Sequence, residues 1–328
     1  MLNILKGLTN IPSTLCLGAS PSYVEPTYDW KNDTALKGMW SVYDIKGDGN
    51  DILGAVQGNG SVTNMTRTEY EGINSAGYSS GLVDVMYLYN QAVGGSARYA
   101  SRLRQTQSTT SYRPSIAYAP YNRFDYVQFN NSGQYTGESL EVSQSDLTVK
   151  MDEDFTIVVV AQNQDQANDI YSNYPFIGGF HYAESMGNSV NDDFRGLHET
   201  DAYNSLLNAR SHDSTSSTQS ASSLSTSFSN TAYQTIAGTF TSGSNATCDA
   251  RSLYVNGNHI ATNNNNVSNV GHGTSAFAFF AVGARRGGFG GNADRIAMKL
   301  KAVLLYNKVL TADEITTIYQ ELPDLVGL

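Results

Sequence analysis

The fold is decided by two stretches of the chain, SLYVNGNHIA at residues 252–261 and RIAMKLKAVLLYNKVLTADEITTIYQEL at residues 295–322. In the first, Asn256-Gly257 lies between short apolar runs and supplies the two positive φ angles of a type I′ turn. In the second, apolar residues alternate with Lys299 and Lys301 over residues 295–307, which predicts a strand whose lysines face solvent. Together these patterns predict a β-hairpin followed by a strand with one buried face.

The end of the second stretch predicts a short helix. Thr311 and Glu314 have the spacing of a capping box, in which each residue satisfies a backbone amide of the other. Apolar side chains then recur at helical spacing and predict a face packed on the sheet: Ile315, Ile318, Tyr319 and Leu322. Pro323 is expected to end the helix, because proline cannot donate the next backbone hydrogen bond.

Further strands are predicted on both sides of these stretches. Residues 154–162, DFTIVVVAQ, form a continuous apolar run that indicates a central strand. The Ser/Thr-rich residues 211–231 predict either a long exposed loop or a weak edge strand. The other predicted strands are short and rich in aromatic or β-branched residues: 38–45, 83–91, 124–130, 233–240 and 277–284.

Many strands and one late helix predict an all-β fold, an antiparallel β-sandwich of the jelly-roll kind with a short C-terminal helix. Residues 1–30 contain three prolines and no clear period, and are expected to form an extended N-terminal arm. Residues 31–328 are expected to form one sandwich domain, since all-β domains of this size are common.

Composition limits the function classes. The net charge is −10, and only 15% of residues are charged. An acidic chain without clustered Lys and Arg does not suit nucleic acid. No apolar stretch reaches 18 residues, so no membrane span is expected. A surface solubilised by uncharged polar residues is common in proteins that face the outside of a cell.

The series YQTIAGTF (233–240), LYVNGNHIA (253–261), FAVGARRGG (280–288) and residues 295–322 resembles the concanavalin A-like, laminin-G-like lectin superfamily. In that superfamily a strand leads to an "LYVNG" hairpin, and "LTADEI" opens a short closing helix. The resemblance implies a concanavalin A-like sandwich. It also implies carbohydrate binding as one function, and bound calcium as an alternative to having no cofactor.

Residues 83–118 resemble the arabinofuranosidase-like branch of the superfamily, which also occurs in phage-encoded sandwich domains. The matching positions are Tyr89-Asn90-Gln91, Gln105, Gln107, Arg113-Pro114 and Ile116. The glycosidases of this branch carry a vicinal cysteine pair, whereas Cys16 and Cys248 are far apart in this sequence. The resemblance therefore implies a non-enzymatic bacteriophage virion protein, such as a capsid decoration, head fibre or tail-associated protein.

In this hypothesis the sandwich is displayed on the virion surface, or is otherwise extracellular. The arm at residues 1–30 would contact other capsid or tail proteins or sister copies in a homo-oligomer. A carbohydrate-binding module for host glycans is the first alternative, and it is compatible with display on a particle. A glycoside hydrolase of arabinofuranosidase-like type is the second alternative.

The glycosidase alternative needs two carboxylates that flank a sugar bond. The best cluster is FHYAESMGNSVNDDFRGLHETD at residues 180–201, where Glu184 and Asp192 are the catalytic candidates. The ligand-binding candidates of the same segment are Tyr182, Asp193, Arg195 and His198. A solvated polar loop at the rim of the sandwich explains the same composition, because spacing within a loop does not fix the separation of two carboxylates.

The segment KGDGND (46–51) and Asp44 before it supply candidate metal ligands. Asp44, Asp48, Asn50 and Asp51 lie close together in sequence, and Ca²⁺ prefers oxygen ligands of these types. The segment lacks the twelve-residue spacing and closing Glu of a calcium loop. A plain turn rich in Asp, Asn and Gly explains the sequence equally well.

Overall fold

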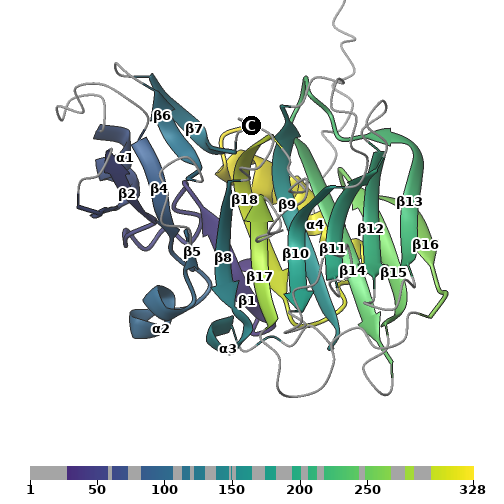
Figure 1. Cartoon of the computed structure of the whole chain (residues 1–328). Coiled ribbons are helices and arrows are strands. Elements are labelled where there is room, and N and C mark those ends of the chain that lie inside the picture. The colour runs from purple at the N-terminus through teal and green to yellow at the C-terminus, as the bar shows by residue number, and fades with distance from the viewer. Residues whose placement is uncertain are drawn as a thin grey trace, which may run out of the picture.

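The structure is a computed structural model that describes a sandwich domain and the strands beside it. The described residues are 28–57, 61–72, 83–105, 113–118, 122–129, 138–147, 149, 153–164, 174–181, 194–200, 206–212, 218–243, 248–266, 278–283 and 297–328. Within them, hydrogen bonds join eighteen strands into one continuous sheet, which folds over into two packed layers. Figure 1 shows the strands side by side, with the N-terminal strands at one end and β13, β15 and β16 at the other.

The first layer is called the helix-side sheet, because the C-terminal helix packs on it. Its strands pair in the order β1, β18, β9, β14, β15, β16, and every pair is antiparallel. Their bounds are Leu36–Ser41 (β1), Met298–Tyr306 (β18), Phe155–Asn163 (β9), Gln234–Ser242 (β14), Cys248–Val255 (β15) and Asn258–Asn263 (β16). The central place predicted for residues 154–162 is confirmed, since β9 pairs with β18 on one side and β14 on the other.

The second layer is called the opposite sheet. Its strands pair in the order β8, β17, β10, β11, β12, β13, again antiparallel. Their bounds are Ser139–Ser143 (β8), Ala278–Gly283 (β17), Tyr174–His181 (β10), Phe194–Thr200 (β11), Leu206–His212 (β12) and Thr218–Ser227 (β13). The Ser/Thr-rich segment 211–231, for which the sequence predicted either a long exposed loop or a weak edge strand, thus contains a strand, β13, which pairs with β12.

The N-terminal strands connect the two layers at one end of the molecule. Strand β5 pairs with β8 of the opposite sheet, and β7 pairs with β18 of the helix-side sheet. The remaining strands link β5 to β7 through the pairs β2–β3, β2–β4, β4–β5, β4–β6 and β6–β7. Their bounds are Leu53–Gln57 (β2), Thr63–Met65 (β3), Val83–Leu88 (β4), Leu103–Arg104 (β5), Ser115–Tyr118 (β6) and Asn122–Phe129 (β7).

Four short helical segments and one longer helix complete the described structure. The short ones are Trp30–Asn32 (η1), Arg67–Glu71 (α1), Gly95–Ala100 (α2) and Gln144–Leu147 (α3). The longer helix, Ala312–Leu325 (α4), has the predicted capping box: the Thr311 hydroxyl accepts from the Glu314 amide, and a Glu314 carboxylate oxygen accepts from the Thr311 amide at 2.7 Å. No helix among the described residues is long and apolar enough to span a membrane.

The prediction that the helix ends at Pro323 is wrong. Helix α4 continues through Pro323 to Leu325. Proline removes only the hydrogen bond of its own amide. The next turn still closes, because the Val326 amide donates to the Leu322 carbonyl at 3.2 Å. Ile315, Ile318 and Leu322 are buried, so the predicted apolar face is confirmed.

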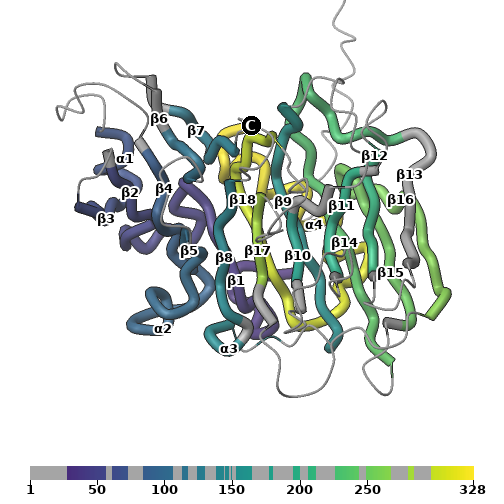
Figure 2. The backbone as a smooth tube through the Cα atoms, in the orientation of Figure 1, coloured from purple at the N-terminus to yellow at the C-terminus, as the bar shows by residue number. Residues whose placement is uncertain are grey.

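Two apolar cores hold the layers together. The larger core lies between the two sheets, where Gly238 of β14 faces the Leu197 side chain of β11 and the Trp40 ring stacks on Phe280 at 5.6 Å between centroids. The second core lies between the helix-side sheet and α4. The antiparallel sandwich with a C-terminal helix is therefore confirmed. Figure 2 shows β1, in purple, near the yellow C-terminal strand with which it pairs.

Strand β18 corrects the prediction that Lys301 faces solvent. Its pairing with β9 shifts between Leu300 and Ala302, which makes Lys301 the extra residue of a β-bulge. Leu300 lies in the core between the sheets, whereas Ala302 lies in the core beneath α4. Lys301 is 4% exposed. Its ammonium donates to the carbonyls of Val326 at 2.8 Å and Gly327 at 3.2 Å, and so holds the end of α4.

The hairpin between β15 and β16 has the predicted turn, with φ of 50° at Asn256 and 76° at Gly257. Residues 1–27 of the expected arm lie outside the described residues. Tyr28 and Trp30 are part of the folded domain. The Trp30 indole is buried and donates to a Glu321 carboxylate oxygen of α4 at 2.7 Å.

Candidate functional site

The candidate site is a line of six residues on the face of the opposite sheet that points away from the core, here called the cross-strand row. Backbone pairing places them side by side on successive strands, in the order Arg104, Glu141, Ala281, Gly178, Gly196, Arg210. The neighbours of these residues along the strands, such as Leu140, Val142, Phe280 and Leu197, fill the core between the sheets. Because side chains alternate along a strand, the row lies on the outer face.

The middle of the row differs from its ends. Ala281, Gly178 and Gly196 carry no side-chain atom beyond a methyl group. The two ends carry long polar side chains, Arg104 and Glu141 at one end and Arg210 at the other. From Glu141 to Arg210 there are four strand-to-strand steps of about 4.8 Å, so their backbones lie roughly 19 Å apart. The row therefore has a floor of small, buried residues between two polar ends, and Ala281 is only 1% exposed.

His198 extends the Arg210 end of the row. It lies on β11 two residues beyond Gly196, on the same face, and its Nε2 atom is 3.0 Å from Nη1 of Arg210. Asn208, two residues before Arg210 on β12, also faces outward. Glu141 and His198 are each 3% exposed. The outer face of this sheet thus buries several polar side chains, which is costly unless they have hydrogen-bond partners.

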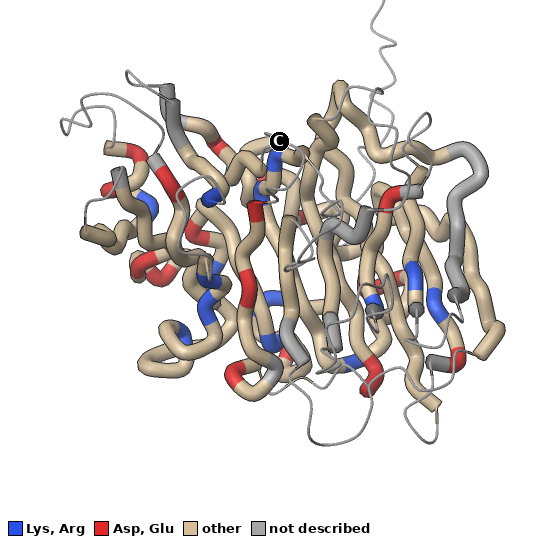
Figure 3. The backbone as a smooth tube through the Cα atoms, in the orientation of Figure 1, with Lys and Arg blue, Asp and Glu red and all other residues tan. Residues whose placement is uncertain are grey.

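The hydrogen-bonding groups of the row are the guanidinium groups at its two ends and the carboxylate of Glu141. Guanidinium groups donate in a fixed fork, whereas a carboxylate accepts at two oxygens. Figure 3 shows that charged residues gather around the N-terminal strands, while most of the central strands are uncharged. An arrangement of few charges beside a polar, hydrogen-bonding floor suits a hydroxyl-rich ligand better than a polyanion, which requires clustered cations.

The predicted ligand-binding residues Arg195 and His198 do not share a site. They stand three positions apart in β11, so the alternation of the strand sends them to opposite faces. The Arg195 guanidinium lies between the sheets, with its Cζ 4.7 Å from the centroid of the Phe155 ring, and its Nη1 donates to the Glu153 carbonyl. At 1% exposure, Arg195 stabilises the core and does not line the outer face.

The other candidates of segment 180–201 lie outside the described residues. They are the catalytic candidates Glu184 and Asp192 and the ligand-binding candidates Tyr182 and Asp193. Their roles stay predictions. Glu141, Arg104 and Arg210 were not predicted as site residues. The available signal was Glu141 itself, an acidic residue between Leu140 and Val142 in a strand whose alternation sends it to the face opposite the core.

The four metal candidates lie in a tight turn. Both carboxylate oxygens of Asp44 accept backbone amides, from Gly47 and Gly49 at 2.9 Å each. Asp48 accepts the Asn50 amide at 3.0 Å and pairs with the Arg98 guanidinium at 2.9 Å. These contacts build the turn itself. Within the described ranges no group of three or more His, Cys, Asp or Glu side chains is placed to hold a metal, and calcium binding stays a prediction.

Asn90 and Gln91 of the arabinofuranosidase-like match are buried and hold the scaffold together. The Asn90 side chain accepts the Met39 amide at 3.0 Å and donates to the Lys37 carbonyl at 2.7 Å. The Gln91 side chain accepts the Ile45 amide at 2.9 Å and donates to the Tyr43 carbonyl at 2.7 Å. These two residues tie β1 and the segment after it to the N-terminal strands. Their place in the fold explains the motif without a catalytic role.

Comparison with known families supports the fold. A model of the concanavalin A-like lectin/glucanases superfamily matches residues 180–316, which is less than half of the chain. The match covers most of the opposite sheet and the "LYVNG" hairpin. The predicted concanavalin A-like class of sandwich is thereby confirmed. Residues 83–118 lie outside the match, so the arabinofuranosidase-like branch is a matter for proposal. No curated protein matches the chain.

Solved structures of similar shape come from several sources. A Trypanosoma rangeli sialidase in complex with the inhibitor DANA is 15% identical, with a TM-score of 0.45, and covers 84% of this chain and 34% of its own. The CBM40 of a Ruminococcus gnavus sialidase, bound to α2,3 sialyllactose, is 18% identical, with a TM-score of 0.40, covering 58% of this chain and 96% of its own. The chain spans about a third of the length of the sialidases it matches. Likenesses of this degree carry no argument about activity.

Proposed function

We propose that this chain is a non-enzymatic carbohydrate-binding sandwich that holds an oligosaccharide across the cross-strand row. The observation that carries the proposal is the row itself: a floor of Ala281, Gly178 and Gly196 between Arg104 and Glu141 at one end and Arg210 with His198 at the other. The lectin and glucanase superfamily match is compatible with this function.

The chemistry of the row fits a sugar chain in two ways. The floor residues are small but buried, with Ala281 only 1% exposed, so a ligand would contact the row mainly through Arg104, which is exposed, and Arg210, which is partly exposed. The polar ends can satisfy hydroxyl groups, which are both donors and acceptors. A span of roughly 19 Å between the backbones of Glu141 and Arg210 suits several linked sugar units better than a single one.

Replacing Arg210 by Met should weaken oligosaccharide binding about tenfold or more. A hydrogen bond to a charged group contributes about 1.5 to 3 kcal/mol, and about 1.4 kcal/mol corresponds to a factor of ten in affinity. The ligand is first identified on a glycan array, and its affinity for the variant is then measured by titration calorimetry. Met keeps most of the apolar stem of the arginine and removes its guanidinium, so the melting temperature is expected to change little.

The matched control is Lys37→Met, which removes a cation from β1 in the helix-side sheet. Lys37 donates only to the Thr34 carbonyl nearby, and its loss should leave the affinity unchanged. An array without any bound glycan would refute the proposal. So would a glycan whose affinity is the same for the Arg210→Met variant and the unmodified chain.

The glycosidase alternative requires a second carboxylate opposite the first at a defined separation. Glu141 is the carboxylate of the cross-strand row, and the candidates Glu184 and Asp192 lie outside the described residues. Hydrolysis of an arabinoside, abolished in Glu184→Gln, would favour the enzyme over the binding module.

We also propose that the sandwich is displayed on a bacteriophage virion and anchored through the N-terminal arm, as a capsid decoration, head fibre or tail-associated protein. The support is the phage-like resemblance of residues 83–118 and the proline-rich sequence before Tyr28. Glycan binding and display are compatible, because a sandwich on a particle surface can adhere to host glycans. The arm would then bind virion proteins or sister copies.

Removal of residues 1–27 should abolish incorporation into particles while the sandwich still folds. The truncation keeps Tyr28 and Trp30, since both pack against the domain. Cryo-electron microscopy and gel analysis of purified particles measure incorporation, and the melting temperature of the truncated protein reports its folding. A folded, truncated protein that still assembles at normal occupancy would show that the arm is not the anchor.

A further inference from the structure

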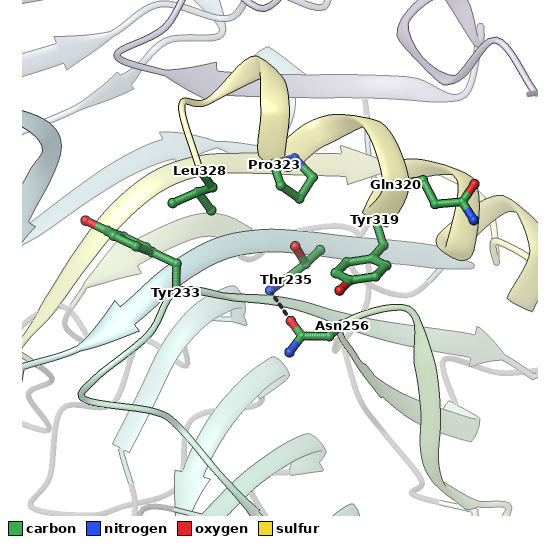
Figure 4. A pocket seen from close by; sticks show the side chains of 7 residues that line it. All are labelled: Tyr233, Thr235, Asn256, Tyr319, Gln320, Pro323 and Leu328. Carbon is green, nitrogen blue, oxygen red and sulfur yellow. Dashed lines mark hydrogen bonds between the residues drawn. The ribbon is translucent and has the colours of Figure 1, made fainter. Parts of the chain in front are cut away.

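A pocket of about 370 Å³ lies between α4 and the helix-side sheet, next to the turn of the β15–β16 hairpin. Seven residues line it: Tyr233, Thr235, Asn256, Tyr319, Gln320, Pro323 and Leu328. Figure 4 shows Tyr233 and Tyr319 toward opposite ends, with Thr235 and Asn256 between them and Pro323 on the helix side. Its volume is within the range of sites for small ligands.

The pocket is separate from the cross-strand row. The row lies on the outer face of the opposite sheet, whereas the pocket lies against the outer face of the helix-side sheet. The core between the sheets stands between them. A ligand in the pocket therefore cannot contact the residues of the row.

The hairpin turn fixes one wall of the pocket. The Asn256 side chain accepts the Thr235 amide at 3.0 Å, and the Asn256 amide donates to the Thr235 carbonyl at 2.7 Å. The Tyr319 ring lies against Gly257, where an added Cβ would come within 2.7 Å of the ring. The Thr316 hydroxyl of α4 contacts the Gly257 carbonyl at 3.3 Å. The hairpin turn and helix α4 contact each other directly, so Asn256 and Tyr319 are positioned in the absence of a ligand.

Tyr233, the second tyrosine of the pocket, packs against Lys301, the buried lysine of the β-bulge. The Lys301 ammonium lies 5.1 Å from the centroid of the Tyr233 ring, on the negative face that attracts a cation. The Tyr233 hydroxyl is protonated at neutral pH, since the ordinary pKa of tyrosine is about 10 and burial raises that of Tyr233, and it is able to donate. Both tyrosine rings are thus fixed by contacts outside the pocket.

The lining offers ring faces and neutral hydrogen-bonding groups. All seven lining side chains are uncharged. In the described part of the chain, the hydroxyls of Tyr233 and Tyr319 and the Nδ2 amide of Asn256 have no hydrogen-bond partner. These groups are therefore available to a ligand. A charged ligand would leave water here without contacting a charged side chain of the lining, which is unfavourable.

A sugar ring matches this combination. It carries C–H groups on its faces, which pack on the negative face of a tyrosine ring, and hydroxyls around its edge, which pair with amide and phenol groups. We propose that the pocket binds a single neutral sugar unit, as a second carbohydrate site distinct from the cross-strand row. This inference goes beyond the proposed function and does not depend on it.

The test uses the full chain labelled with ¹⁵N and titrated with four probes, the methyl glycosides of glucose, galactose, mannose and arabinose. At least one probe is expected to shift the amide signals of Thr235, Asn256 and Tyr319 saturably, with a dissociation constant on the order of 1 mM, as expected for few contacts. Asn256→Asp keeps the bond from the Thr235 amide and the positive φ, but removes the Nδ2 donor. It should weaken binding about three- to tenfold, as should Tyr319→Phe.

Three controls make the result specific. Tyr99→Phe removes a hydroxyl from an exposed tyrosine of α2 and should not alter the affinity. Arg210→Met should leave pocket binding intact, and Asn256→Asp should leave oligosaccharide binding at the row intact, so the two sites can fail separately. The proposal is overturned if none of the four glycosides gives a saturable shift at the pocket. It is also overturned if the shift persists unchanged in Asn256→Asp.

Discussion

Replacing Trp40 by Ala should lower the free energy of unfolding by about 3 to 5 kcal/mol, the usual cost of removing a large aromatic side chain from a core. Trp40 is fully buried between the two sheets and stacks on Phe280 with an interplanar angle of 18°. Its indole also donates to the Ser101 carbonyl at 3.2 Å. Alanine would leave a cavity where the N-terminal strand β1 meets β17, and would leave that carbonyl without its donor.

The measurement is urea-induced unfolding followed by fluorescence and circular dichroism. Trp40→Phe is the graded control, since it keeps a ring for Phe280 and should cost clearly less than alanine. Gly38→Ala should also lower the free energy of unfolding, because an added Cβ would lie only 2.1 Å from the Trp40 ring and would displace it. If the free energy of unfolding of Trp40→Ala is within about 1 kcal/mol of that of the unmodified chain, the packing described between the sheets is wrong.

Stability should fall steeply above about pH 10, where tyrosines of the unfolded chain ionise. Burial raises the pKa of Tyr306, Tyr28 and Tyr233, and raises the pKa of Tyr89 to about 12. For Tyr28, a hydrogen bond donated to the Asp33 carboxylate adds to the effect. In this range the unfolded state binds fewer protons than the folded state, so each group removes up to about 1.4 kcal/mol of stability per pH unit.

Lys301 has the opposite effect on the pH dependence of stability, over a lower pH range. Burial lowers the pKa of Lys301, so the folded state releases this proton before the unfolded state does. Its contribution to stability therefore rises with pH up to the ordinary lysine pKa of about 10.4, and is constant beyond it. Burial alone would lower the pKa of Lys308, but hydrogen bonds to Asp33 and Glu314 outweigh it and raise that pKa, so the contribution of Lys308 to stability is lost above about pH 10, together with that of the tyrosines. A net loss of stability above that pH is thus the combined effect of the tyrosines and Lys308.

Unfolding free energies measured between pH 8 and 12 check this prediction. Tyr306→Phe serves as the diagnostic variant, because it keeps the buried ring and removes only the hydroxyl, whose hydrogen bond to the Trp30 carbonyl is long at 3.4 Å. Above pH 10 its stability should fall less steeply, by about 1.4 kcal/mol per pH unit. Parallel curves for Tyr306→Phe and the unmodified chain would contradict the assignment of the alkaline loss to this group.

Helix α4 and strand β18 show where prediction from sequence succeeds and where it fails. The capping box and the apolar face of α4 depend on residues within one or two turns, and both were predicted. Which residues of β18 face each side of the sheet after Leu300 was not predicted correctly. Alternation from Met298 onward sends Lys301 to solvent, but the pairing with β9 inserts a bulge at that residue. A bulge depends on the partner strand, which lies more than a hundred residues earlier in the chain.

The candidate site shows the same division. The acidic and aromatic segment 180–201 has polar residues close together in sequence, which predicted a site, yet Arg195 and His198 of that segment face opposite sides of β11. The cross-strand row is assembled from six strands, with one residue each from β5, β8, β17, β10, β11 and β12. Neither the row nor the pocket beside α4 has a local sequence pattern.

The antiparallel sandwich, the type I′ hairpin at Asn256-Gly257 and the capped helix follow from the order of the amino acids, because strand alternation, turn geometry and helix caps are properties of neighbouring residues. Strand pairing, the positions of the register shifts and the polar contacts across strands become known only in the folded chain. Those outcomes depend on contacts between distant segments, such as Glu141 beside Ala281 or Tyr319 against Gly257. A binding face on a β-sandwich is built from such contacts, since each strand contributes only one or two side chains to it.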